Sequence, residues 1–260
     1  MDPIKQFNDN NERKKAEMVS DINFLESTKA WISDANRYEY SYRFTALGRP
    51  IIQYPQDMIA MQELIWQVKP DLILEFGIAH GGSLIMSAQM LATIEYCEAV
   101  KTGQMVDPQN PKGRVLGIDI DIRSHNREAI EKHPMSNRID MIQGSSIEQP
   151  IIDQVHAYAK KYKNILISLD SNHTHDHVLA ELKAYASLIS VNSYCVVFDT
   201  LIEDLPSDYE WTNRSWGKGN NPKTAVHKFL ATNYNFIIDK SIDEKILISV
   251  APDGYLKRIS

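Results

Sequence analysis

The sequence predicts an α/β protein with a Rossmann-like, doubly wound and mostly parallel sheet, an N-terminal helical appendage and a C-terminal β-hairpin. Short apolar runs alternate with longer amphipathic segments, which is typical of parallel strand–helix–strand units. The first apolar run breaks into a glycine-rich loop before a helix, at residues 75–83. Later apolar runs end in acidic or small polar residues, as expected where parallel strands border a ligand crevice.

Composition limits the class of protein. With 260 residues, 43% hydrophobic and 24% charged, the chain can bury one substantial core. Its net charge of -6 argues against a broad nucleic-acid surface, which would need a basic footprint. Cys97 and Cys195 stand in apolar contexts and are interpreted as free thiols of a reducing compartment. We find no N-terminal apolar leader and no membrane-spanning stretch, so we expect a cytoplasmic protein.

The N-terminal part, residues 1–55, is predicted to be a helical appendage to a main domain of residues 56–260. It is polar and helix-like, and its aromatic residues gather between Trp31 and Phe44. Such aromatic residues usually serve packing. We therefore expect this segment to dock on the main domain or on another subunit of a homo-oligomer.

A loop that carries two prolines, residues 48–57, leads into the main domain, and Asp57 is a plausible N-cap for the helix that follows. The predicted helices are residues 58–68, 84–96, 124–132, 147–161, 176–188 and 222–230. The predicted strands are residues 72–74, 114–121, 139–146, 164–170, 194–199, 236–238, 246–250 and 255–259. A polar segment with prolines, residues 101–113, is interpreted as an exposed connector. A turn at Pro252–Gly254 is expected to join the last two strands into the hairpin.

The glycine loop after the first strand resembles a dinucleotide fingerprint and departs from it at one position. Gly77 and Gly82 occupy the first and third glycine positions, but Ala79 stands where the middle glycine lets a pyrophosphate approach the backbone. This argues against NAD and an NAD oxidoreductase. It is compatible with an adenosyl ligand that has no phosphate, of which S-adenosylmethionine (SAM) is the obvious candidate.

Polar residues after the second and third strands are candidates for binding the rest of such a ligand. Asp119 is favoured to accept both ribose hydroxyls, with Asp121 as the alternative residue, while a helix cap or a solvated turn acid is the other interpretation of Asp119. The small residues Gly144, Ser145 and Ser146 could border the adenine or form a bare turn.

Asp170 and Asp199 end two further strands. If these strands are neighbours, about 5 Å apart, both carboxylates could bind one Mg²⁺, which would acidify an acceptor hydroxyl. Two separate capping aspartates are the alternative. His173, close behind Asp170, is well placed as a general base. His175 and His177 complete an alternating run whose spacing does not match a zinc site, and we interpret them as surface or helix-start residues.

The sequence resembles the cephalosporin hydroxylase/rhamnosyl O-methyltransferase family from about Arg37 to the C-terminus. This family consists of class I SAM-dependent methyltransferases and includes macrolide sugar O-methyltransferases. The resemblance rests on a combination of seven segments, namely residues 48–53, 75–83, 117–123, 169–174, 198–204, 216–224 and 250–258. It implies the class I methyltransferase type of doubly wound fold.

The resemblance also implies roles for matching residues. The SAM-binding residues would be Glu75, Gly77, Ala79, His80, Gly82, Ser83, Asp119, Ser145 and Asp170. Asp170 and Asp199 would be Mg²⁺ ligands, and His173 would be the base. The family carries an acidic pair at the end of the fifth strand, but here the first member is Phe198, which cannot coordinate a metal. Glu203 and Asp204 in the following loop could replace this missing metal ligand, or they could be solvated loop acids. Residues 216–223 would form a flap over the acceptor.

The predicted function is therefore a SAM-dependent O-methyltransferase that acts on a hydroxyl of a sugar or a glycosylated natural product. His173 is the predicted general base, with Mg²⁺ as an assisting ion. Two alternatives belong to other classes, namely an Fe/2-oxoglutarate-type hydroxylase and a non-catalytic SAM-binding protein. The hydroxylase needs a 2-His-1-carboxylate iron site, for which we find no convincing candidate in the sequence.

Overall fold

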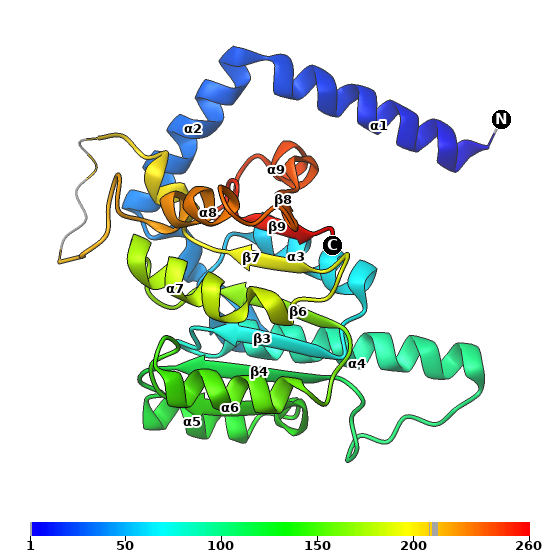
Figure 1. Ribbon diagram of the computed structural model, residues 1–260. Helices are drawn as coiled ribbons and strands as arrows, with labels where there is room; N and C mark the ends of the chain where they lie inside the picture. Colours follow the sequence, from blue (N-terminus) through cyan, green and yellow to red (C-terminus); the bar gives the residue numbers. More distant parts are fainter. Residues whose placement is uncertain (1, 208, 210–212) are drawn as a thin grey trace.

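A central sheet organises the protein, which we describe from a computed structural model over residues 2–207, 209 and 213–260 (Figure 1). The strand order is β5-β4-β3-β6-β7-β9-β8. The strands are β3 (Leu72–Phe76), β4 (Arg114–Asp119), β5 (Ile139–Gln143), β6 (Ile165–Leu169), β7 (Tyr194–Val197), β8 (Phe236–Ile238) and β9 (Tyr255–Arg258). Strands β3 to β7 pair in parallel, whereas β9 is antiparallel to both of its neighbours. The predicted doubly wound, mostly parallel sheet is confirmed.

Helices cover both faces of this sheet. They are α3 (Pro55–Val68), α4 (Gly82–Thr102), α5 (Ser124–Glu131), α6 (Gln149–Ala159), α7 (His175–Tyr185), α8 (Pro222–Leu230) and α9 (Lys240–Ile246). Ile73 of β3 packs in the same core cluster as α3 and α4, whereas Leu72 and Leu74 pack with α6 and α7. Successive side chains of a strand point to opposite faces, and both faces are buried here. This explains why the strands read as continuous apolar runs.

The order of the strands defines where a ligand can bind. From β3 the chain proceeds outward through β4 and β5, then crosses back to β6 and continues through β7. The direction of winding therefore reverses between β3 and β6. In open α/β sheets the crevice outside the carboxyl ends of the strands at such a switch point is the usual ligand site.

The N-terminal part forms the predicted helical appendage, with a small sheet that was not anticipated. It comprises α1 (Pro3–Ser20), α2 (Ile22–Arg37), the 3₁₀-helix η1 (Tyr40–Arg43), β1 (Phe44–Ala46) and β2 (Arg49–Ile51). In Figure 1, α1 extends along the outside of the molecule, and it buries no residue. The boundary between residues 55 and 56 falls at the start of α3, and a division into two domains stays a prediction.

Aromatic rings cluster within this appendage and join it to the main domain, because Tyr54 belongs to the same core cluster as α3 and α4 and Tyr40 packs against that cluster. The ring of Trp31 lies 5.2 Å from that of Tyr40 and 6.3 Å from that of Tyr54, which precedes α3. The rings of Tyr40 and Tyr54 are 5.5 Å apart. These rings serve packing, as expected.

The predictions for the C-terminal part need two corrections. Residues 246–250 do not form a strand, because α9 extends to Ile246 and the segment after it is irregular. The C-terminal hairpin is instead the antiparallel pair of β8 and β9.

The prediction that Asp57 caps α3 is also wrong, since Tyr54 occupies the N-cap position. The Asp57 carboxylate is buried and accepts hydrogen bonds from Ser249 Oγ (2.6 Å), Val250 N (2.9 Å) and Tyr255 Oη (2.7 Å).

Most other elements lie within a few residues of their predicted bounds. The exception is α4, which was expected to end at Tyr96 and continues to Thr102. Strands β4, β5 and β7 end two or three residues earlier than predicted, and β6 ends one residue earlier. The polar residues that were expected to end these strands therefore lie mostly in the loops that follow. In the part of the chain that the structure describes, no helix combines the length and the hydropathy needed to cross a bilayer.

Candidate active site

Two glycines give the loop after β3 its shape. Gly77 has φ +99°, and a Cβ added there would lie 2.1 Å from the carbonyl oxygen of Asp170. Gly82 begins α4, where a Cβ would lie 2.2 Å from the carbonyl oxygen of Pro50. Only residues without a Cβ allow the loop to approach both the end of β6 and the N-terminal hairpin. Ala79, the residue at the middle glycine position, also has a positive φ, of 45°.

Side chains from three elements hold this loop. The Asp119 carboxylate accepts a hydrogen bond of 2.8 Å from Ile78 N through Oδ2. The Arg49 guanidinium donates to the carbonyl oxygen of His80 from Nε (3.0 Å) and Nη2 (2.6 Å). Asn126 Nδ2 donates to the carbonyl oxygen of Ala79 (2.8 Å). The loop is therefore fixed before any ligand arrives.

A cleft of about 450 Å³ opens over this loop at the switch point. Among the predicted site residues it is lined by Gly77, Ala79, His80, Gly82, Ser83, Asp170, His173 and Asp199. Residues that the sequence analysis did not single out complete its walls, including Asn36, Glu39, Ser41, Tyr42, Gln53 and Arg214. The first five come from the N-terminal appendage, so this appendage forms one wall of the cleft.

The remaining predicted site residues lie beside this cleft. Asp119 lies under the glycine loop, with Oδ1 accepting from Asp121 N (3.0 Å) and Oδ2 from Ile78 N. Ser145 begins the turn before α6, and its carbonyl oxygen accepts from Glu148 N (3.0 Å). Glu75 points into a second, smaller cavity of about 20 Å³ behind the cleft.

The smaller cavity brings together buried carboxyl groups. Glu75, Asp57 and Asp170 line it together with Gln53 and Phe198. Burial raises the pKa of Glu75 to about 7, although the Ser87 hydroxyl donates a hydrogen bond to it. Burial likewise raises the pKa of Asp57 to about 6. Such shifts arise because a low-dielectric surrounding disfavours the charged form of a carboxyl group.

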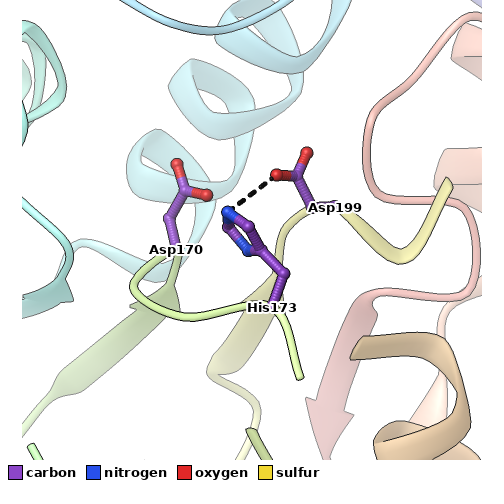
Figure 2. Close-up of side chains that lie close together, drawn as sticks. All are labelled: Asp170, His173 and Asp199. Carbon is purple, nitrogen blue, oxygen red and sulfur yellow. Dashed lines mark ion pairs between the residues drawn. The ribbon is translucent and has the colours of Figure 1, made fainter. Parts of the chain in front are cut away.

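At the ends of β6 and β7, Asp170, His173 and Asp199 converge as shown in Figure 2. Each offers a ligand atom, and these atoms lie within 4.8 Å of one another. His173 Nε2 is 3.0 Å from Asp199 Oδ2. The prediction that the two strands are neighbours is confirmed, because β6 pairs in parallel with β7.

The electrostatics of this group favour a cation. Burial raises the pKa of Asp170 well above its usual range, and the negative charge of Asp199 raises it further. Gln53 Nε2 donates a hydrogen bond of 3.2 Å to Asp170 Oδ2, and Gln53 is only 5% exposed. A divalent cation between the two carboxylates would offset their repulsion. Two carboxylate oxygens are suitable ligands for Mg²⁺, whose other positions are usually taken by water or substrate oxygens.

The acidic residues considered as substitutes for Phe198 have other partners. Phe198 itself is 6% exposed and packs in the core. Glu203 Oε2 accepts a hydrogen bond of 2.7 Å from Gly219 N, and Asp204 pairs with Lys223 Nζ at 2.5 Å. Over residues 2–207, 209 and 213–260, the group able to hold a metal ion consists of Asp170, His173 and Asp199. These residues therefore fit a metal through two carboxylates, with a neighbouring imidazole.

The predicted flap lies directly on His173. The ring of Trp216 meets the imidazole edge-on, with 4.7 Å between ring centroids, and the Arg214 guanidinium lies 4.9 Å from the Trp216 ring centroid. His175 and His177 turn away from this group. His175 Nδ1 is 2.8 Å from Thr224 Oγ1, and His177 Nε2 is 3.1 Å from Ser146 Oγ. The three histidines therefore do not converge on one point.

Comparison with known proteins identifies the family. The model of the rhamnosyl O-methyltransferase/CmcI family matches residues 38–259. The chain belongs to this family. The protein is accordingly a SAM-dependent O-methyltransferase, and the predicted fold class, enzyme class and methyl donor are confirmed. The hydroxylase alternative receives no support.

Individual relatives agree with this family assignment. The protein is 28% identical over 209 residues to the rhamnosyl O-methyltransferase of Mycobacterium bovis (strain BCG / Pasteur 1173P2), covering 78% of this chain and 73% of the relative. It is 28% identical over 165 residues to that of Mycobacterium leprae (strain TN), covering 62% of each. A solved structure of CmcI with Mg and SAM covers 84% of this chain and 78% of that chain, at 16% identity and a TM-score of 0.52. This likeness shows the shared fold.

Gln53, which lines the cleft, and Arg49, which holds the glycine loop, could have been found from the sequence. Arg49 and Gln53 lie in the segment 48–53 that carries the resemblance, and their polar side chains in a proline-bearing loop were the available signal. Tyr42 and Arg214 offered no such signal, because nothing in their neighbourhood indicates that they face the cleft.

Proposed function

We propose that the protein transfers the methyl group of SAM to a hydroxyl of a sugar or a glycosylated natural product, with His173 as general base. The observation that carries this proposal is the position of His173, which lines the cleft together with the glycine loop and lies beside the carboxylates of Asp170 and Asp199. The names of the relatives support a sugar acceptor, since they are rhamnosyl O-methyltransferases.

The donor would lie across the switch point. The methionine part of SAM would follow the loop that includes Gly77, His80 and Ser83. The Glu75 carboxyl group would approach it from the smaller cavity behind this loop. Asp119 and Ser145 would bind the ribose and the adenine. The acceptor would then enter from the side of His173, below Trp216. Holding both reactants in line is expected to supply most of the rate enhancement.

His173 would remove the acceptor proton. Its hydrogen bond to Asp199 requires the proton on Nε2, which leaves Nδ1 free to accept. As the acceptor oxygen bonds to the methyl carbon, the carbon–sulfur bond breaks and S-adenosylhomocysteine leaves. The proton passes to Nδ1, and Asp199 stabilises the resulting imidazolium. A bound Mg²⁺, held by Asp170 and Asp199, would supply acidification of the acceptor hydroxyl.

Turnover with glycosidic acceptors tests the proposal. The protein is incubated with SAM and a panel of rhamnosides and other glycosides, and S-adenosylhomocysteine and the methyl ether are measured by mass spectrometry. We expect one methyl ether per S-adenosylhomocysteine formed, a loss of rate after EDTA treatment and its recovery with Mg²⁺. Tight SAM binding without product from any glycoside would refute the sugar acceptor. A rate independent of Mg²⁺ would leave Asp170 and Asp199 with positioning roles alone.

Asp119 is predicted to matter for donor binding. Asp119→Asn is expected to weaken SAM binding by about tenfold, or roughly 1.4 kcal/mol, because the glycine loop loses a charged hydrogen-bond acceptor. Calorimetry measures this, with the exposed neighbour Asp121→Asn as matched control. A larger loss in the Asp121 variant would transfer the ribose role to that residue.

We also propose a homo-oligomer in the cytoplasm. Helix α1 buries no residue, and Ile4, Phe7 and Ile22 are 71%, 64% and 73% exposed. Such side chains support an interface with a second copy. The free thiols of Cys97 and Cys195 are compatible with a reducing compartment. Light scattering that gives a mass near 29.7 kDa would refute the oligomer.

A further inference from the structure

The flap was predicted at residues 216–223, but α8 begins at Pro222, so the flap is defined from here on as residues 213–221, between η4 (Thr200–Glu203) and α8. It carries the ring that covers His173. Gly217 and Asn220 form an antiparallel bridge, with both N–H···O distances at 3.0 Å. Trp216 immediately precedes this bridge and places its ring against His173. The base of the flap therefore sets the position of the indole.

The flap is anchored to the two loops that hold the catalytic group. Glu203, four residues after Asp199, accepts hydrogen bonds from Gly219 N (2.7 Å) and from Asn221 Nδ2 through its Oε2. On the other side, Asn220 Oδ1 accepts from His175 N (2.9 Å), two residues after His173. A carboxylate that accepts from N–H groups forms stronger hydrogen bonds than a neutral acceptor. Glu203 is thus the charged part of this anchorage.

The partner of Glu203 cannot turn away. Asn221 is fully buried and caps α8, where its Oδ1 accepts from Thr224 N (3.2 Å) in a capping box. With Oδ1 used in this way, its Nδ2 must serve as the donor, and it also reaches the carbonyl oxygen of Gly217 (2.9 Å). The orientation of this amide is therefore fixed by the helix cap.

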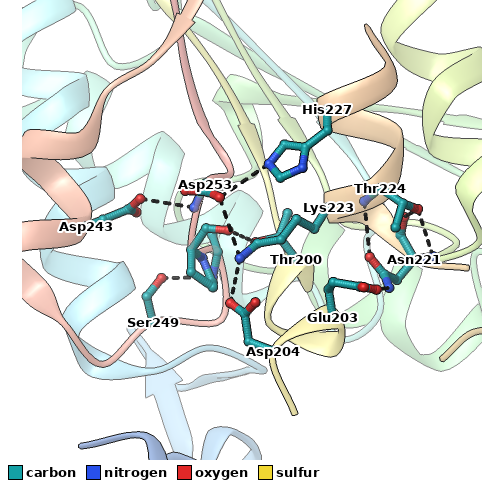
Figure 3. A network of polar contacts seen from close by, with 12 residues as sticks. Thr200, Glu203, Asp204, Asn221, Lys223, Thr224, His227, Asp243, Ser249 and Asp253 are labelled. Atoms are coloured by element: carbon teal, nitrogen blue, oxygen red, sulfur yellow. Dashed lines mark hydrogen bonds and ion pairs between the residues drawn. The ribbon is translucent and has the colours of Figure 1, made fainter. Parts of the chain in front are cut away.

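The surroundings of Glu203 form a rigid frame, shown in Figure 3. The Thr200 hydroxyl donates to the carbonyl oxygen of Pro252 (2.7 Å). Lys223, 9% exposed in its side chain, lies between Asp204 (2.5 Å) and Asp253 (3.6 Å). These contacts tie η4 and α8 to the C-terminal loop independently of the flap. Glu203 is the side chain that extends this frame to the flap backbone.

We propose that Glu203 is a positioning residue that holds the flap, and with it Trp216, against His173 on the acceptor side of the cleft. The inference rests on the methyl-transfer function proposed above. Loss of Glu203 releases the flap, so the acceptor is held less well while the donor site, built from the glycine loop, is unaffected.

The test uses trypsin, because Arg214 and Lys218 lie in the flap. The full-length variants Glu203→Ala and Glu203→Gln are digested under native conditions, and cleavage after these two residues is followed by mass spectrometry. We expect cleavage about tenfold faster in Glu203→Ala and less accelerated in Glu203→Gln, which keeps one acceptor oxygen. Asp204→Asn is the matched control, since the neighbouring acid binds Lys223 instead of the flap, and it should leave the cleavage rate unchanged.

Kinetics provide the second measurement. Glu203→Ala is expected to raise the KM for the acceptor by about tenfold, with the Kd for SAM unchanged. Wild-type cleavage rates and an unchanged KM in Glu203→Ala would overturn the proposal. If the alanine variant does not fold, the same two measurements on Glu203→Gln decide. If cleavage accelerates but even the wild type methylates no glycoside, the flap assignment stands and the proposed function fails.

Discussion

Replacement of His173 by alanine is expected to lower kcat by about 10²–10⁴-fold, the usual contribution of a general base. The imidazole lines the cleft, and its Nε2 is hydrogen-bonded to Asp199, so the ring is oriented to accept a proton. Alanine leaves the glycine loop intact, and the Kd for SAM should therefore stay unchanged. Single-turnover methyl transfer at saturating SAM, together with calorimetry, measures both quantities.

A matched control for this variant is His156→Ala. His156 lies on α6, where its Nε2 is 2.9 Å from the carbonyl oxygen of Ala184, away from the cleft. Its replacement should leave kcat within about twofold of the wild type. A His173→Ala enzyme with wild-type kcat would show that the acceptor proton leaves by another route.

Replacement of Glu75 by glutamine is expected to stabilise the protein at pH 8 by roughly 3 kcal/mol. The pKa of Glu75 is raised to about 7 in the folded protein from 4.5 in the unfolded chain. Between these values the folded state binds more protons. The stability due to this group is therefore fully present below pH 4.5 and is lost as the pH rises through 7. Glutamine stays neutral and avoids that loss.

Urea unfolding at pH 5 and pH 8 measures the effect. Glu75→Gln should show a smaller fall in unfolding free energy between these two pH values than the wild type. Glu131→Gln, an exposed position on α5, serves as control and should change stability by less than about 0.5 kcal/mol. A destabilised Glu75→Gln variant at pH 8 would mean that the ionised carboxylate has a favourable partner, such as the bound donor.

The centre of the fold could be predicted because its signals are local. The central residues of strands β3, β4 and β6 are buried on both faces, so each strand appears in the sequence as a mainly apolar run between polar segments. The helix predicted over residues 222–230 is confirmed as α8, where Asn221 forms the cap and Pro222 the first residue of the helix. Parallel strands end at the same edge, which is why the sequence alone indicated Asp170 and Asp199 as candidate ligands of one ion.

The parts that could not be predicted depend on contacts between distant residues. Asp57 has the sequence context of a helix cap, but its carboxylate binds Ser249 and Tyr255, 192 and 198 positions away. The same contact holds residues 249 and 250 in a loop, although their composition suits a strand. Tyr42 and Arg214 face the cleft only because the appendage and the flap fold over the sheet edge. No local pattern encodes such placements.

The position of β9 between β7 and β8 has a consequence for synthesis on the ribosome. A nascent chain that has emerged only as far as Gly254 leaves β7 at an open edge, with the segment that carries Asp199 lacking its lateral support. Strand β8 pairs with β9, so it gains its place in the sheet only once residues 255–258 have paired with β7. The edge of the sheet beside Asp199 is therefore expected to form late, and methyl-transfer competence with it.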